Sequence, residues 1–356
     1  MSKSTLIPFG PQHPVFLEPI NLQLELDEER VVGASLNFGY AHRGMEKAMA
    51  ADFRRSIYLS ERICGICSFY HTSAYCQGME AIFNVVPPER AKHVRIVMME
   101  LQRLTSHLLA LGHTAEAIGY ESLFMQCFRE RERIMRLVNS ISGNRVHYSM
   151  NTIGGVRGDI SPEQGKEVLK ALDDLESGFA DLAAVFHRDG TIRRRMAGVG
   201  VLGADQARSY GVVGPVARAS GLRQDLRLLY YEDLDFRPVV REEGDAYART
   251  LVRVDEITQS IELVRQALGR MPEGPLLALV KGNPPPGESF TRLEAPRGEM
   301  LYYILAKGKT ELERIKVKTP TFMNAAALKA MVPGCEVADI PTITVSVDPC
   351  ICCTER

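Results

Sequence analysis

The sequence lacks several features that would assign it to a class at once. It has no tryptophan, and its 43 Lys and Arg residues balance 44 Asp and Glu residues. No apolar run reaches the roughly 18 residues of a membrane span, and the N-terminus, Met-Ser-Lys-Ser-Thr, lacks the apolar segment of a signal peptide. Balanced charge also leaves no electrostatic footprint for nucleic acid. We therefore expect a cytoplasmic protein with no nucleic-acid partner.

The chain also lacks internal repeats, low-complexity tracts and a clear linker. Alternating apolar and polar residues predict strands, whereas apolar residues spaced three and four apart predict helices. The expected strands cover 20–27, 31–40, 300–306 and 312–318, and the expected long helices cover 89–112, 119–142, 161–188 and 245–270. This order predicts an α+β fold that is predominantly α, with a long central helix bundle and small antiparallel strand pairs near both termini.

One domain covering 1–356 is expected, because no linker divides the chain. Residues 1–60 form its N-terminal strand region, 61–272 its helical core, and 273–356 a segment with a loop, a hairpin and metal ligands. Within the last segment, 274–298 contains three consecutive prolines and is predicted to be an ordered loop.

Eight cysteines in a chain without an export signal argue against a disulfide framework and for metal or redox chemistry. Four of them form two Cys-x-x-Cys pairs, Cys64 with Cys67 and Cys350 with Cys353. This spacing lets both sulfurs of a pair reach one metal from a single turn. Either pair alone is also typical of a zinc or thioredoxin-like motif. Because nearly the whole chain separates the pairs, the pattern favours a catalytic cofactor that is bound once the fold is complete.

Further motifs occur in a fixed order around these pairs. They are Arg43-Gly44-Met45-Glu46, Cys67-Ser68-Phe69-Tyr70-His71, Ala295-Pro296-Arg297-Gly298 and Asp348-Pro349-Cys350. With them, the chain resembles the large subunit of NiFe hydrogenases. The segments 10–14, 42–44, 106–109, 211–215 and 219–221 are similar to one branch of that family. This branch is shared by the energy-converting, membrane-associated (group 4) hydrogenases and the quinone-site subunit of respiratory complex I.

The resemblance implies a NiFe centre whose iron carries CO and cyanide ligands. Cys64 and Cys350 would be terminal ligands of nickel, and Cys67 and Cys353 would bridge nickel and iron. The other implied site residues are Glu18 for proton transfer, Arg297 beside the metals with Pro296 in the same loop, His71 as donor to a bridging sulfur, and Ser346 as donor to an iron-bound cyanide.

A second ion site is a feature of many members of the resembling family. They have His where this chain ends in Arg356, and they bind a magnesium or iron ion that also contacts the residue matching Glu46. A guanidinium cannot ligate a metal but pairs with a carboxylate. We therefore expect Arg356 to replace the ion, to pair with Glu46 and to fix the C-terminal strand over the cluster.

The implied function is that of the catalytic subunit of an energy-converting hydrogenase, which interconverts H2 with protons and electrons at the inner face of the cell membrane. The implied partners are a small subunit with a proximal 4Fe-4S cluster, a polyferredoxin-like subunit, membrane antiporter-like subunits and ferredoxin as electron carrier. Two alternatives stay open, a complex I-like quinone-reductase subunit and a non-catalytic metal-binding scaffold. Complex I lacks the four cysteines, and its quinone-binding histidine falls near Leu17 here.

We expect structural roles for the other four cysteines and for two charge-rich stretches. Cys352 is expected to be a packed thiol beside the site, and Cys76, Cys127 and Cys335 are expected in the core. The charge-rich stretches 129–133 and 193–195 are predicted to be solvated faces or subunit contacts.

Overall fold

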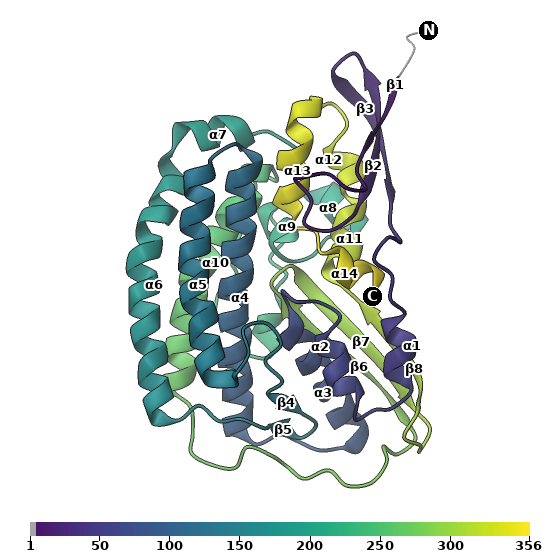
Figure 1. Cartoon of the computed structure of the whole chain (residues 1–356), viewed down its shortest axis with the longest axis vertical. Coiled ribbons are helices and arrows are strands. Elements are labelled where there is room, and N and C mark those ends of the chain that lie inside the picture. The colour runs from purple at the N-terminus through teal and green to yellow at the C-terminus, as the bar shows by residue number, and fades with distance from the viewer. Residues whose placement is uncertain (1–4) are drawn as a thin grey trace.

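Long helices form one flank of the molecule (Figure 1). The computed structural model describes residues 5–356. Its long helices are α4 (Glu89–Ala117), α5 (Glu121–Ser142), α6 (Pro162–Arg188) and α10 (Ala246–Gly269). α4 packs against α5 and α10, and α6 packs against the same two helices. α4 and α10 are buried along most of their length, whereas α5 and α6 each bury one apolar stripe.

Local sequence signals fix where these helices begin and end. Ser161 and Gln164 form a reciprocal capping box at the start of α6, with Pro162 in the first turn. Asp245 caps α10 by accepting from the Ala248 N–H at 2.7 Å. The predicted helices are confirmed, although α4 extends five residues beyond the predicted end at Gly112, to Ala117.

A three-stranded antiparallel sheet extends from the upper end of the molecule (Figure 1). It consists of β1 (Thr5–Phe9), β2 (Asn21–Asp27) and β3 (Arg30–Asn37), in that order. The alternate residues Leu22, Leu24 and Leu26 of β2 are buried, as the alternation predicts. The sequence prediction missed β1 and placed the end of β3 three residues too late.

A second three-stranded antiparallel sheet contains β6 (Gly287–Ala295), β7 (Gly298–Ala306) and β8 (Leu312–Lys318). Helix α3 (Ser68–Phe83) packs against β6 and β7. The prediction of a loop over 274–298 is wrong in its second half, because β6 pairs with β7 along its whole length. Only Pro296 and Arg297 connect these two strands, so Arg297 sits at the tip of a tight hairpin.

The rest of the chain forms short elements around the bundle and the sheets. They are α1 (Met45–Ala50), α2 (Ser56–Glu61), β4 (Asn151–Thr152), β5 (Gly155–Val156), α7 (Gly190–Met196), α8 (Ala204–Tyr210), α9 (Gly214–Ala219), η1 (Leu226–Leu229), α11 (Pro320–Ala326), α12 (Leu328–Met331), η2 (Val337–Asp339), α13 (Ile340–Val347) and α14 (Ile351–Glu355). The expected C-terminal strand is therefore wrong, because α13 and α14 form that segment. The expected fold class, α+β and predominantly α, is confirmed. Among residues 5–356, no helix is both long and apolar enough to cross a bilayer.

Candidate metal centre

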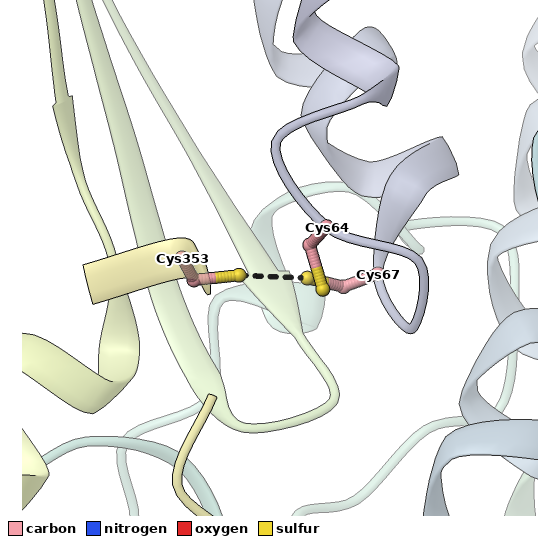
Figure 2. A group of neighbouring side chains, drawn as sticks. All are labelled: Cys64, Cys67 and Cys353. Atoms are coloured by element: carbon pink, nitrogen blue, oxygen red, sulfur yellow. Dashed lines mark hydrogen bonds between the residues drawn. The ribbon is translucent and has the colours of Figure 1, made fainter. Parts of the chain in front are cut away.

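Four cysteine sulfurs converge where the loop between α2 and α3 meets the start of α14. The Sγ atoms of Cys64 and Cys350 are 3.4 Å apart, those of Cys67 and Cys353 are 3.4 Å apart, and those of Cys350 and Cys353 are 3.2 Å apart. Figure 2 shows Cys353 pointing at Cys64 and Cys67 from the opposite side. All four residues are buried. We call this group the sulfur site.

Each Cys-x-x-Cys pair is held at the beginning of a helix. Cys67 is the N-cap of α3, and Cys350 is the N-cap of α14. Arg43 donates to the carbonyl oxygens of Arg62 and Ile63 at 2.8 and 2.6 Å, which fixes the turn before the first pair. Beside the second pair, the Thr321 hydroxyl accepts from the Cys350 N–H at 3.1 Å. Hydrogen bonds from distant segments therefore orient both pairs.

The donor set fits soft metal ions. The buried sulfurs of Cys64, Cys67 and Cys353 cluster together, and the Cys350 sulfur contacts those of Cys64 and Cys353. Thiolate sulfurs are ligands of soft transition-metal ions. Hydrogen bonds with Cys350 and Cys353 hold the pKa of Cys64 well below its usual value, whereas bonds with Cys350 and Cys64 raise the pKa of Cys353 well above it. The protein alone thus favours one thiolate over four, because like charges repel at this distance. A cation bound among the sulfurs would favour the thiolate form of all four.

His71 lies beside the sulfur site as a neutral side chain. Burial lowers the pKa of His71 to about 4. Its Nδ1 is 2.7 Å from the Tyr302 hydroxyl, and its Nε2 is 3.4 Å from the Cys353 Sγ. With the proton on Nε2, the ring donates to the sulfur while Nδ1 accepts from Tyr302. This is the contact that the resemblance implied for His71.

Arg297 is held rigidly by three hydrogen bonds. It donates to the Asp348 carbonyl oxygen and carboxylate at 2.8 and 2.7 Å, and to the Ser106 hydroxyl at 3.2 Å. Burial alone would lower the pKa of Arg297, but Asp348 and the nearby cysteines raise it above its usual value, so the guanidinium stays charged. Pro296 is buried in the same turn.

Two glycines allow the Arg297 turn to reach this position. A Cβ on Gly214, which has φ +67°, would lie 2.3 Å from the Arg297 carbonyl oxygen. A Cβ on Gly298, with φ +126°, would lie 2.6 Å from the Gly214 nitrogen. The two backbones touch, and only glycine allows that approach. The motif around Gly214 therefore contributes to the site through packing.

Glu18, in the N-terminal region, contacts the N-terminal turn of α14, which carries the second cysteine pair. Its carboxylate accepts from the backbone N–H groups of Ile351 and Cys352, the latter at 3.1 Å. A carboxylate at a helix N-terminus is electrostatically favourable. Burial, followed by the hydrogen bond with Glu18, raises the pKa of the half-buried Cys352 to about 12, so this residue stays a thiol.

Ser346 does not have the environment that the sequence led us to expect. It lies in helix α13 rather than in a strand. Its hydroxyl donates to the Ile343 carbonyl oxygen at 2.7 Å and accepts from Arg249 Nε at 2.9 Å. Its single proton is therefore committed to the backbone. Offering that proton to another acceptor would require the hydroxyl to rotate.

The expected ion pair between Glu46 and Arg356 is present. Arg356 Nε lies 2.8 Å from Glu46 Oε1, and Lys316 Nζ lies 3.3 Å from Oε2. Although burial raises the pKa of Glu46, the Val317 N–H and Arg356 lower it more, and the net shift is downward. With Arg314 at 3.9 Å as well, three cationic side chains surround the carboxylate. This environment disfavours a divalent cation.

Several contacts of the site were missed from the sequence. Tyr302 behind His71 looks only like one more residue of an alternating strand, and Ser106 looks like part of a branch motif. The charged stretch 129–133 was predicted to be a solvated face or a subunit contact, and one of its residues, Glu130, is instead fully buried. Cys76 and Cys127 are core residues as expected, and Cys335 is half-buried. Contacts between residues as far apart as His71 and Tyr302, which are separated by 231 positions, leave no pattern in the local sequence.

Comparison with known proteins adds to this geometry. Residues 117–283 and 277–356 match the family model "Respiratory-chain NADH dehydrogenase, 49 Kd subunit", and residues 43–116 match "Nickel-dependent hydrogenase". The chain belongs to this hydrogenase and complex I family. Within the family it is related to subunits of energy-converting hydrogenases and of complex I-like oxidoreductases.

Individual relatives carry different activities. The chain is 38% identical to the carbon monoxide-induced hydrogenase of Rhodospirillum rubrum, with 98% of this chain and 99% of the relative covered. It is also 38% identical to one of the subunits of the F(420)H(2) dehydrogenase of Methanosarcina mazei, with 98% and 97% covered. A subunit of the membrane-bound sulfane sulfur reductase, an archaeal respiratory membrane complex, superposes with a TM-score of 0.94 at 30% identity, covering 99% of this chain and 98% of that one. The fold therefore does not decide the reaction.

Proposed function

We propose that this chain is the catalytic subunit of an energy-converting NiFe hydrogenase. The observation that carries the proposal is the sulfur site, in which four cysteines from the two ends of the chain meet with their sulfurs 3.2 to 3.4 Å apart. A quinone pocket has no need of four converging thiols, whereas a nickel-iron centre needs this donor set. Cys64, Cys67, Cys350 and Cys353 would hold the metals, and Glu46 would not.

A bound NiFe centre with CO and cyanide on iron would supply the polarisation of H2 that separates it into proton and hydride equivalents. The protein residues then have distinct tasks. Arg297, charged and fixed by Asp348, provides a permanent positive charge beside the sulfurs. His71, neutral and fixed by Tyr302, donates to the Cys353 sulfur and so tunes its basicity.

Proton transfer is assigned to Glu18. Its carboxylate lies against the N-terminal turn of α14, the same turn that carries Cys350 and Cys353. A proton released at the sulfurs therefore has an acceptor on the other side of one helical turn. From Glu18 the proton could pass to solvent, because Glu18 is itself partly exposed.

Electrons must leave through a partner. Within residues 5–356, three members of the sulfur site, Cys64, Cys67 and Cys353, are the one group of three or more His, Cys, Asp or Glu ligand atoms close enough to hold a metal. The proposed partners are a small subunit with a proximal 4Fe-4S cluster, a polyferredoxin-like subunit and membrane antiporter-like subunits, with ferredoxin as the carrier. The chain would lie peripherally on the inner face of the cell membrane.

Metal analysis combined with infrared spectroscopy tests the proposal. The purified complex should contain nickel and iron at this site in equal amounts and should show infrared bands from CO and cyanide. Absence of nickel, with quinone-dependent turnover, would instead support the complex I-like interpretation that the match to the respiratory-chain NADH dehydrogenase model favours. Zinc without redox activity would support a metal-binding scaffold.

A further inference from the structure

A second group of buried charges lies between the helix bundle and the end of β6. It contains three arginines and four carboxylates joined by ion pairs of 2.7 to 3.9 Å, and none of these side chains is more than 3% exposed. We call it the buried charge network. Its members are Glu100, Arg103, Arg218, Asp225, Arg227, Glu256 and Glu294. None of them belongs to the sulfur site.

Compensation of charge is uneven within this network. Arg218 serves three carboxylates at once, with ion pairs to Asp225 at 3.2 Å, Glu256 at 2.8 Å and Glu294 at 2.7 Å. Asp225 and Glu256 have Arg227 as a further partner. In the described part of the chain, Glu294 has Arg218 alone. A buried carboxylate is poorly stabilised as an anion when its one guanidinium partner also pairs with two other carboxylates.

Glu294 also lies where solvent can reach the network. It lies at a surface pocket of about 400 Å³ whose lining includes Asp225, Leu226, Arg292 and Glu299. One carboxylate oxygen accepts from Arg218, and the other accepts from the Leu226 N–H at 3.2 Å. Water in the pocket can therefore deliver a proton to a carboxylate that is otherwise buried.

Charged and titratable groups surround Glu294 on every side. Burial raises the pKa of Glu294 to about 7, and Asp225 adds to the increase while Arg218 and Arg103 oppose it. Glu299 lies opposite Glu294 in the β6–β7 register but is paired with Arg292. The groups that act on Glu294 or pack around it are Tyr70, Glu100, Arg103, Arg218, Asp225, Arg227, Glu256, Arg292 and Glu299.

We propose that Glu294 is a proton-binding site, which exchanges one proton with water in the pocket and thereby sets the charge of the buried network behind the Arg297 hairpin. The proton adds to a carboxylate oxygen and returns to the same water, with no change in electrons. Arg103 links the charge of Glu294 to the Arg297 hairpin, because it donates to the backbone oxygens of Glu294 and Ala295 at 2.6 and 3.5 Å. These residues directly precede Pro296 and Arg297. The proton site itself does not rest on the proposed function.

Infrared difference spectroscopy of the purified complex provides the test. Over a titration from about pH 5 to about pH 9, we expect the C=O band of a protonated carboxyl group to disappear with a midpoint near 7. Glu294→Gln should remove this band, and Glu299→Gln, which alters a carboxylate of the same pocket, should leave it. A wild-type complex without a titrating carboxyl band, or a band that persists in Glu294→Gln, would overturn the proposal.

Asp225→Asn gives a second test that keeps Glu294 in place. Removing the neighbouring anion should move the midpoint to lower pH by about one unit. An unchanged midpoint would show that the titrating group lies elsewhere, and this result is decisive even if Glu294→Gln does not assemble.

The free energy of unfolding should also depend on the protonation of Glu294. Between the ordinary value of 4.5 and about 7, the folded chain holds a proton that the unfolded chain has released. The stabilising contribution is therefore complete below pH 4.5 and is lost as the pH rises through 7. Glu294→Gln should lack this decline in urea unfolding, whereas Glu299→Gln should retain it. An identical decline in Glu294→Gln would contradict the assignment.

Discussion

The sulfur site and the buried charge network are both buried and both assembled from distant segments, yet they differ in how their charges are compensated. In the network, carboxylates and guanidiniums neutralise one another within the chain. At the sulfur site, four like groups converge, and the neighbouring cation Arg297 is already paired with Asp348. The charges of the network are therefore compensated within the chain except at Glu294, the proposed proton site, whereas the sulfur site is arranged for a cation from outside.

Removing one sulfur should have the largest effect. Cys64→Ser or Cys350→Ser replaces a soft thiolate with a hard hydroxyl, and we expect loss of nickel and of hydrogenase activity. Nickel per chain, measured by mass spectrometry, and H2 turnover are the readouts. Cys352→Ser is the matched control and should retain both. Full nickel occupancy in Cys64→Ser would show that the four sulfurs do not hold the metal.

Removing one charge from the network should destabilise the fold. Glu256→Gln removes one of the three carboxylates paired with Arg218 and the carboxylate partner of His107, at a cost of about 3 to 5 kcal/mol. The free energy of unfolding should fall by that amount. Glu262→Gln, on an exposed position of the same helix α10, should change it little. Equal losses in the two variants would mean that the network contributes no special stability.

Arg297→Lys separates charge from geometry at the sulfur site. A flexible ammonium cannot reproduce the fixed bonds to Asp348 and Ser106. We expect metals to stay bound while turnover falls about 100-fold, the scale found for losing one positioned electrostatic group. Arg292→Lys, on the exposed face of the same hairpin, should have normal turnover. If Arg297→Lys does too, the hairpin acts in folding alone.

Glu18→Gln tests the proton route. The amide keeps the size of the side chain but cannot take up a proton, so proton/deuterium exchange should slow by about 100-fold or more. The CO and cyanide infrared bands should be unchanged, because Glu18 contacts the backbone of α14 and no sulfur of the metal site. Glu25→Gln, exposed on β2, is the control. Unaltered exchange would assign proton transfer to another neighbour.

The Glu46–Arg356 pair should give the smallest effect. Both side chains are partly exposed, at 17% and 11%, so Arg356→Met should lower the free energy of unfolding by about 1 kcal/mol or less. A double-mutant cycle with Glu46→Gln isolates the pair. We also expect no stabilisation of the wild type by added Mg²⁺. A magnesium-dependent rise in stability that Glu46→Gln abolishes would reverse our interpretation.

The sequence predicted the elements whose signals are local. The apolar stripe of α4, the capping box at Ser161 and the alternation of β2 each lie within a few residues, and all were located correctly. β6 was missed because its alternation follows a proline-rich loop and becomes evident only when β7 lies beside it. Helices α13 and α14 were predicted as strand because short apolar segments have the same composition in either state.

By itself, the sequence determined the long helices and named the four cysteines, because spacing is a property of the chain. Only the tertiary structure decided which groups face one another. It placed Tyr302 behind His71, occupied the Ser346 hydroxyl with Arg249, and gathered seven charges from five segments into one network. The energy of a buried charge depends on its partners in space. Such partners can be far apart in the sequence, as Arg103 and Glu294 are, which are separated by 191 positions.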